Sequence, residues 1–190
     1  MSNVILDVTM SLDGFMAGPD VSAEHPMGRG GLKLHEWIFD APSNPVDEDR
    51  LQQRAATTGA VVMGRRTFDL GVDLWKDTPW PAPCFVITNR PMPPRPEKSG
   101  TFTFVTDPAQ AHQAAVAAAG GRDVRLMGAQ ASQQLLGAGL VDELHIQVAP
   151  VLLGAGRRLF EQLGVDPVDL ERIAVIESPR VTHLHYRVLR

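Results

Sequence analysis

The segment at residues 59–68, GAVVMGRRTF, joins a short apolar run to residues that can bind an anion. The apolar run has strand character and stops at Gly64, and Arg65, Arg66 and Thr67 follow at once. Glycine permits a sharp turn, so a strand can pass into a helix within very little chain. If Thr67 lies in the first helical turn, free backbone N–H groups and a positive dipole end meet two guanidinium groups. The segment therefore predicts an anion site, most suited to phosphate; a turn whose arginines only face water is the alternative.

Two later predicted strands are also followed directly by polar or glycine residues. Residues 84–87 and 123–127 both predict strands, and each run stops at a polar or glycine-marked turn. In open α/β sheets ligands bind beyond the carboxyl ends of the strands, so we expect these turns to converge with Gly64 on one ligand. An ordinary polar exit from each strand is the alternative. The residues that follow the two strands are Thr88, Asn89 and Arg90 in the first case and Gly128, Ala129 and Gln130 in the second.

Two carboxylates are candidates for chemistry on a substrate. Residues 4–10 predict an apolar strand with Asp7 in its middle, and a buried carboxylate is costly unless it is paired, protonated or facing a pocket. Asp7 is our first candidate for a proton relay or for binding a substrate amidine edge, and a carboxylate that simply reaches water is the alternative. Glu36 is the second, because its segment, 32–39, follows a glycine-rich loop that could close over a pocket. Trp37 in that segment is either a stacking wall for the substrate or a core residue.

Other residues of reactive type are assigned structural roles. Asp13, in the turn at 11–14, is expected to order that turn by accepting hydrogen bonds from nearby backbone N–H groups. His183 and His185 share one face of a predicted strand, but no carboxylate or cysteine joins them locally, so we interpret them as ordinary strand residues. The single cysteine, Cys84, cannot form a disulfide framework or a cysteine-rich zinc site. We therefore predict no metal site.

Strands and helices must alternate along the chain to position these residues. Continuous apolar strands indicate a sheet covered on both faces, as in α/β folds. We find no internal repeat and no clear linker, so we expect a single domain over residues 1–190. Strands are predicted at 4–10, 59–63, 84–87, 102–105, 123–127 and 140–148, with a closing hairpin of 170–176 and 181–189. Helices are predicted at 32–39, 45–58, 108–119 and 129–139, and loops at 15–31 and 70–83.

Composition limits the class of protein. With 44% hydrophobic and 21% charged residues, the chain is typical of a globular protein with a substantial core. Its net charge of −4 provides no basic surface, so we expect no nucleic-acid partner. No apolar stretch is long enough to span a bilayer, and no signal peptide is evident at the first residues. We therefore expect a soluble cytoplasmic protein with no membrane partner.

The order of several motifs is more specific than any one of them. SLDG at 11–14, VMGRRTF at 62–68, VITNRP at 86–91, GLVDEL at 139–144 and PVLLGAG at 150–156 follow one another along the chain. Together they resemble the dihydrofolate reductase-like superfamily. They are most similar to the reductase domain of bifunctional riboflavin-biosynthesis deaminase-reductases and its stand-alone relatives. The resemblance implies a three-layer α/β/α fold with a mainly parallel sheet and an antiparallel C-terminal strand.

The resemblance also implies NADPH as hydride donor and assigns the strand-end residues to it. By position, residues 64–67 would hold the cofactor's phosphates, and residues 88–90 would surround the adenosine ribose and its 2′-phosphate. Residues 128–130 would place backbone N–H groups on the pyrophosphate. Arg66 and Arg90 favour the phosphorylated cofactor, since a dianion is best held by more than one guanidinium group.

On the substrate side, the resemblance implies a contact with Leu153, but the chain departs from the riboflavin branch. Those reductases usually carry a lysine four positions before the serine of SLDG. Asp7 stands there in this chain, which inverts a charge in the substrate pocket. Met127-Gly128 replaces the usual Gly-Gly pair of the third junction. The deaminase motifs are absent as well, because one cysteine cannot supply them.

We therefore predict an NADPH-dependent reductase of a small substrate, either a pyrimidine- or pteridine-like heterocycle or a carbonyl compound. Reduction of the phosphoribosylamino-uracil precursor of riboflavin, or of dihydrofolate, is the alternative within the same class. A nucleotide-binding protein without turnover is the alternative from another class. By analogy with relatives we expect a homodimer, with the apolar region 140–151 as its interface.

Overall fold

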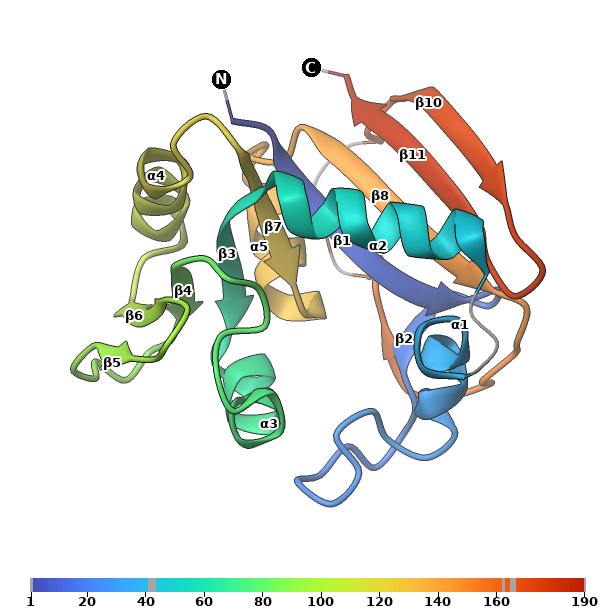
Figure 1. Ribbon diagram of the computed structural model, residues 1–190, viewed down its shortest axis with the longest axis horizontal. Coiled ribbons are helices and arrows are strands. Elements are labelled where there is room, and N and C mark those ends of the chain that lie inside the picture. The colour runs from blue at the N-terminus through green and yellow to red at the C-terminus, as the bar shows by residue number, and fades with distance from the viewer. Residues whose placement is uncertain (1, 41–43, 162, 165–166, 190) are drawn as a thin grey trace.

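One sheet connects the parts of the chain that carry the candidate residues. The computed structural model describes residues 2–40, 44–161, 163–164 and 167–189. Within them, nine strands form a sheet in the order β10-β11-β8-β1-β7-β3-β4-β6-β5 (Figure 1). The six strands from β8 to β6 in this order run parallel to one another, whereas β11 is antiparallel to β8 and β5 is antiparallel to β6. The predicted mainly parallel sheet with an antiparallel C-terminal strand is confirmed.

The strands follow the apolar runs of the sequence closely. Their bounds are β1 Val4–Ser11, β3 Thr58–Gly64, β4 Cys84–Ile87, β5 Arg95–Pro96, β6 Thr101–Val105, β7 Asp123–Met127, β8 Glu143–Ala149, β10 Leu170–Glu177 and β11 Thr182–Val188. The last two form the predicted hairpin. Two short strands, β2 Phe15–Ala17 and β9 Arg157–Arg158, pair separately beside the main sheet. The segment of β2 was predicted to be loop; its pairing with β9, far away in the chain, is a tertiary contact with no local signal.

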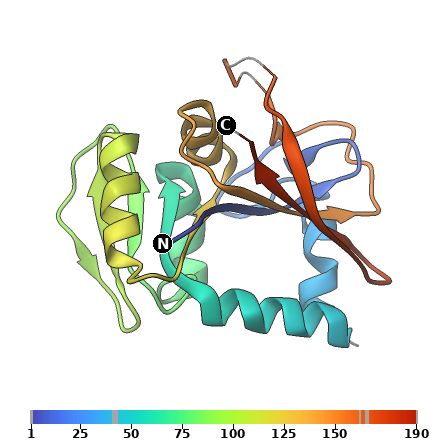
Figure 2. The ribbon, with the colours of Figure 1, turned by 90° about the horizontal axis from the view of Figure 1, so that it is seen from above.

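Helices cover both faces of the sheet. They are the 3-10 helix η1 Gly31–His35 and the α-helices α1 Glu36–Phe39, α2 Pro45–Thr57, α3 Arg65–Trp75, α4 Pro108–Ala118 and α5 Ala129–Gly137. Figure 2 shows α2 along one face of the sheet and α5 on the opposite face. Helices α2 and α4 begin where expected, because Asn44 and Asp107 each cap a helix whose first residue is proline.

Alternation along β3 produces two separate apolar cores. Ala60 and Val62 pack with α4 and α5, whereas Val61 and Met63 pack with α3. The α3 core also contains the fully buried Phe102 of β6. This arrangement confirms the three-layer α/β/α prediction.

Helix α3 runs further than the sequence indicated. The stretch from residue 70 was predicted to be loop, but the helix continues to Trp75. Phe68 and Val72, one helical turn apart, both pack into the core beneath it. Gly71 lies within the helix and does not end it. The Trp75 ring packs against this glycine, where an added Cβ would lie 2.2 Å from the ring.

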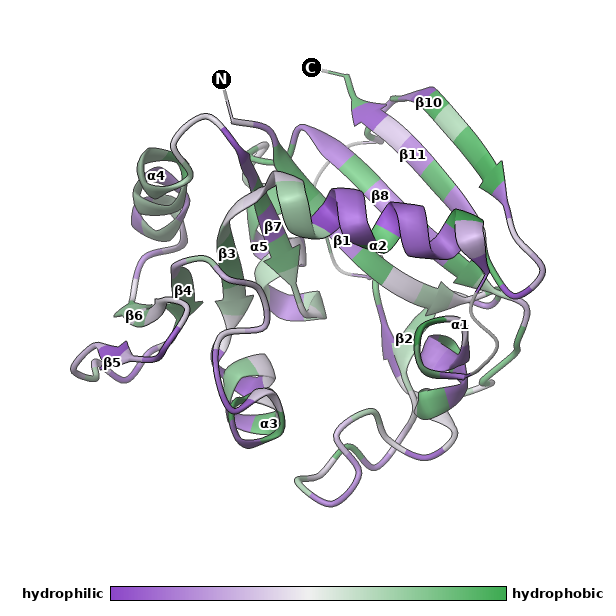
Figure 3. Ribbon diagram, in the orientation of Figure 1, coloured by the Kyte–Doolittle hydropathy of each residue, from purple (hydrophilic) through white to green (hydrophobic). Residues whose placement is uncertain are grey.

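The interface between α2 and the sheet differs from these apolar cores. Figure 3 shows that α2 is hydrophilic along most of its length, although it lies across the sheet. Asp47 on this helix is buried, and so are Asp7, Arg125 and Gln147 on the strands beneath it. A polar layer of this kind must satisfy its charges internally.

We predict that Phe102→Ala lowers the free energy of unfolding by about 3–5 kcal/mol, because it leaves a cavity under α3. Phe102 is fully buried and packs edge-on to Phe68, with ring centroids 5.0 Å apart. Urea denaturation followed by circular dichroism measures the change. Phe39→Ala is the matched control, since Phe39 is 74% exposed, and should change stability by less than about 0.5 kcal/mol. Equal losses in the two variants would contradict this account of the core.

Candidate functional site

The three predicted turns lie side by side at one edge of the sheet. Gly64, the last residue of β3, is in register with Ile87, the last residue of β4. Met63 is in register with Met127, the last residue of β7. The turns that begin at Thr88 and Gly128 therefore flank the turn at Gly64. The sequence predicted this convergence, although whether a cofactor binds there stays a prediction.

Thr67 and Gly128 are in direct contact at this edge. Gly128 has φ = +85°, and a Cβ placed on it would lie only 2.1 Å from Thr67 Oγ1. Helices α3 and α5 thus begin next to each other, after Gly64 and Gly128 respectively, and neither has a side-chain N-cap. Their first backbone N–H groups can therefore serve a ligand that carries negative charge.

The polar residues of the turns are arranged around these two helix starts. Thr88 is buried, and its hydroxyl accepts a hydrogen bond from the Arg90 backbone N–H at 3.1 Å. Arg65 binds Asp69 within α3, with Nε 2.7 Å from Oδ1. Arg66 instead extends toward the loop before α1 and donates to the Val21 carbonyl at 3.4 Å. Asn89, Arg90 and Gln130 are exposed, and Ala129 is buried in the first turn of α5.

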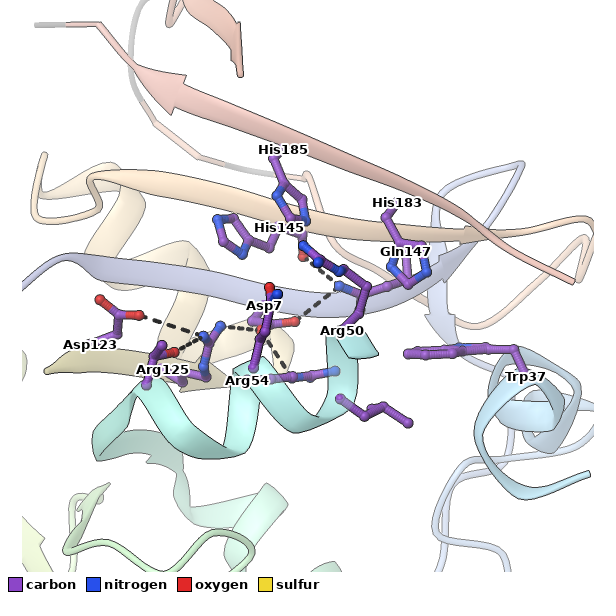
Figure 4. A pocket seen from close by; sticks show the side chains of 13 residues that line it. Asp7, Trp37, Arg50, Arg54, Asp123, Arg125, His145, Gln147, His183 and His185 are labelled. Carbon is purple, nitrogen blue, oxygen red and sulfur yellow. Dashed lines mark hydrogen bonds and ion pairs between the residues drawn. The ribbon is translucent and has the colours of Figure 1, made fainter. Parts of the chain in front are cut away.

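Asp7 lies in a second site, between the sheet and α2. Its Oδ2 is paired with Arg125 Nη1 of β7 and lies 3.0 Å from Arg54 Nε of α2 (Figure 4). Its Oδ1 accepts a hydrogen bond from Gln147 Nε2 at 3.1 Å. Burial by itself would raise the pKa of the Asp7 carboxyl, but Arg54 and Arg125 hold that pKa below its usual value. The Asp7 side chain is therefore held in its charged, carboxylate form.

A pocket of about 230 Å³ opens beside Asp7. Trp37 of α1 closes one side of it, with its ring edge-on to His183 and the ring centroids 5.3 Å apart. His183 is itself bound to the buried Asp47, with Nε2 2.7 Å from Oδ1. The residues that line the pocket are Asp7, Trp37, Arg50, Leu51, Gln53, Arg54, Thr57, Asp123, Arg125, His145, Gln147, His183 and His185.

Sequence reasoning missed most of this pocket. His183 and His185 were interpreted as ordinary strand residues, yet both face the pocket, and His185 stacks on His145 with ring centroids 3.9 Å apart. A signal was available: polar residues recur at every second position of apolar strands, as at His145 and Gln147 and at His183 and His185. Such alternation indicates a sheet face that a polar helix covers.

The residues expected on the substrate side, Asp7, Glu36 and Leu153, lie in different surroundings. Two guanidinium groups stabilise the charged form of Asp7 and so oppose its protonation, and a proton relay through Asp7 stays a prediction. These arginines also offset the charge that Asp7 brings, so the pocket as a whole is not anionic. The Glu36 side chain is exposed and Leu153 is only half-buried, and neither lines the pocket that Trp37 closes.

Asp13 has a structural role, as predicted, but its backbone partners lie in a distant segment and not in its own turn. Its carboxylate accepts hydrogen bonds from the backbone N–H groups of Leu153 at 3.1 Å and Gly154 at 2.8 Å. These donors come from a distant segment, so Asp13 joins the turn after β1 to the loop before β9. The side-chain hydrogen bond with Ser11 contributes most to lowering the pKa of Asp13, to about 2.

No group of three or more histidine, cysteine, aspartate or glutamate side chains among the described residues is placed to hold a metal ion. None of the helices in the described ranges is both long and apolar enough to cross a membrane.

Comparisons with known proteins agree with the predicted resemblance. The family model of the RibD C-terminal domain matches residues 2–184. No curated protein matches the chain in a direct sequence comparison. A solved structure of a Shewanella protein ascribed to riboflavin biosynthesis is 23% identical, with a TM-score of 0.77 over 100% of both chains.

Two further solved structures share the fold at lower identity. Dihydrofolate reductase from Enterococcus faecalis, complexed with NADP(H) and RAB-propyl, is 13% identical, with a TM-score of 0.60 over 99% of this chain and 97% of that one. A deaminase/reductase of a phosphoribosylamino-pyrimidine from Thermotoga maritima is 12% identical, with a TM-score of 0.62 over 99% of this chain and 57% of that one. At these identities the likeness establishes the dihydrofolate reductase-like fold.

Two histidines with a lowered pKa, His35 and His185, should make the stability of the protein depend on pH. Burial is the main cause that lowers the pKa of His35 and of His185 to about 4. The unfolded chain binds these protons at about pH 6.5, so it is favoured as the pH falls from about 6.5 to 4. We expect the melting temperature to decrease through this range. His35→Gln and His185→Gln should each make that decrease shallower, whereas His25→Gln, at an exposed position, should not. A parallel profile in all three variants would contradict the assignment.

Proposed function

We propose that this chain, which belongs to the RibD C-terminal domain family, is an NADPH-dependent reductase of a small pyrimidine- or pteridine-like heterocycle or carbonyl compound. The observation that carries the proposal is the contact between Thr67 and Gly128. A side chain at Gly128 would collide with Thr67, so the glycine allows the two uncapped helix starts to lie next to each other. Two adjacent helix starts suit the pyrophosphate of a dinucleotide, which needs backbone N–H groups at close approach.

The residues around this space fit the remainder of the cofactor. Arg66 and Arg90 are exposed beside the helix starts and supply the two guanidinium groups that a 2′-phosphate favours. Thr88 fixes the turn that carries Arg90. Bound there, NADPH would supply the hydride, while the protein orients the nicotinamide and excludes water.

The pocket under α2 provides room for the substrate, and Asp7 is the lining residue that reaches toward this edge of the sheet. Leu6 is in register with Leu126, so Asp7, the next residue of β1, lies level with the residue that precedes Gly128. Adjacent strands are about 4.8 Å apart, and a substrate in the pocket therefore lies close to a nicotinamide placed at the strand ends. Asp7 holds Arg54 and Arg125 in position at the pocket wall.

Two alternatives are tested in the same assay. The riboflavin precursor and dihydrofolate are each offered as substrates, and NADPH oxidation is followed at its absorbance maximum. Turnover of either one assigns the protein to that reaction. A protein that binds NADPH and oxidises it with no member of a panel of pyrimidines, pteridines and carbonyl compounds would instead be a binding protein without turnover.

We predict that Arg66→Ala and Arg90→Ala each weaken NADPH binding about tenfold or more and leave NADH binding within about twofold. The reason is that each removes a charge-assisted hydrogen bond to the 2′-phosphate, worth about 1.5–3 kcal/mol. Fluorescence titration of both cofactors measures the two dissociation constants. Arg122→Ala is the control, since Arg122 is exposed in the turn after α4. An equal loss of both cofactors would show that neither arginine contacts the 2′-phosphate.

We predict that Gly128→Ala weakens NADPH and NADH alike, by about tenfold or more. The added Cβ would overlap Thr67 Oγ1, so the two helix starts that we propose to hold the pyrophosphate, a group that both cofactors share, would have to move apart. Gly139→Ala is the matched control: Gly139 also has positive φ, but a Cβ there meets nothing within 4 Å. Both variants are strained, so comparing their cofactor affinities and melting temperatures separates loss of the site from loss of stability. Unchanged affinity in folded Gly128→Ala protein would exclude this position from the cofactor site.

A further inference from the structure

One edge of the main sheet is long, apolar and open. Strand β10 lies at the end of the strand order, with β11 on one side and no described strand on the other (Figure 1). An edge strand presents a row of backbone N–H and C=O groups that another strand can bind. Ile173 and Val175 of β10 are 43% and 46% exposed, and Leu170 is exposed as well. This edge therefore offers both hydrogen-bonding groups and apolar side chains.

The opposite edge of the same sheet is protected against such pairing. It is formed by β5, which has only two residues, Arg95 and Pro96. A proline has no N–H to donate, and a short strand gives a second chain little to bind. Strand β10 has eight residues, with no proline and no lysine among them. The difference between the two edges indicates that a partner strand covers β10.

Three exposed side chains of β10 lie on one face of the sheet. Residues directly opposite each other in neighbouring strands share a face. Arg172, Val175 and Glu177 are opposite alternate residues of β11, namely Tyr186, Leu184 and Thr182. An irregularity of the register between residues 172 and 174 brings Arg172 onto this face. Measured along β11, Arg172 and Glu177 therefore lie equally far from Val175, in opposite directions.

We propose that β10 is the interface of a homodimer, in which the β10 strands of two copies pair antiparallel about a two-fold axis. An axis perpendicular to the sheet places one residue opposite its own copy. With Val175 in that position, the two valines meet, and Arg172 of each copy lies opposite the partner subunit's Glu177. Neither charge belongs to an ion pair among the described residues, whereas the neighbouring Glu171 is already paired with Arg187.

These reciprocal charges favour a second copy of the chain over an unrelated strand at this edge. One sequence supplies both halves of each ion pair, with an apolar contact between them. The region 140–151, which was expected by analogy to form the interface, offers no free edge. Most of it is β8, which pairs with β1 on one side and with β11 on the other. The dimer contact therefore lies at β10.

Light scattering and sedimentation of the full chain test the proposal. We expect a dimer at about 100 µM that dissociates on dilution, and a monomer at that concentration would overturn the proposal. Val175→Lys places two like charges at the axis and should raise the dissociation constant about tenfold or more. Leu74→Lys is the matched control, since Leu74 is 64% exposed on α3, and should leave the dimer unchanged. An unchanged dimer in folded Val175→Lys protein would overturn the assignment.

A charge reversal distinguishes this pairing from any other contact between two copies. Arg172→Glu and Glu177→Arg each bring like charges together, so each should raise the dissociation constant about tenfold. The double variant exchanges the two charges and should restore the original dissociation constant to within about threefold. Circular dichroism checks that each variant is folded. A dimer that the single variants do not weaken, or that the double variant does not restore, would show that the copies meet elsewhere.

Discussion

The ion pairs of one buried carboxylate join three elements of the fold, β1, β7 and α2. Asp7 is nearly inaccessible to solvent, and a charge in that position is tolerated only when it is paired. Arg125 supplies one partner and also donates to the hydroxyl groups of Thr57 and Thr58 at 2.9 Å each. The guanidinium group of Arg125 thus ties β7 and β1 to the place where α2 passes into β3.

A polar interface of this kind leaves space that an apolar one would fill. On the opposite face, alanines and leucines of α4 and α5 pack directly on β1, β3 and β7. Under α2, arginines and histidines lie close together, and most of them are paired with a carboxylate. Trp37 and Arg54 are among the residues that line the resulting pocket. The two faces of one sheet therefore differ: one packs an apolar core, and the other is lined with polar and charged side chains around a pocket.

The edge of the sheet at Gly64, Thr88 and Gly128 depends on backbone geometry more than on side chains. Three parallel strands end level with one another, so their turns meet at a single edge. Gly128 adopts a positive φ there, a conformation that is strained for residues with a side chain. The absence of a Cβ at this position also lets Thr67 approach. Through the pairing of β1 with β7, Asp7 in the pocket wall lies level with Met127, the last residue before the turn at Gly128.

The sequence by itself determined the strands, the helix starts and the glycine-marked turns, because these depend on local propensity, apolar periodicity and capping. It also indicated that the turns at Gly64, Thr88 and Gly128 would meet, since parallel strands end at a common edge. Only the tertiary structure decided what surrounds Asp7. Its partners Arg54, Arg125 and Gln147 are 47, 118 and 140 positions away in the chain, and no local pattern encodes which distant charge will neutralise a buried one. The pairing of the strands and the placement of α2 brought them together, and so gave the pocket its arginines and its tryptophan.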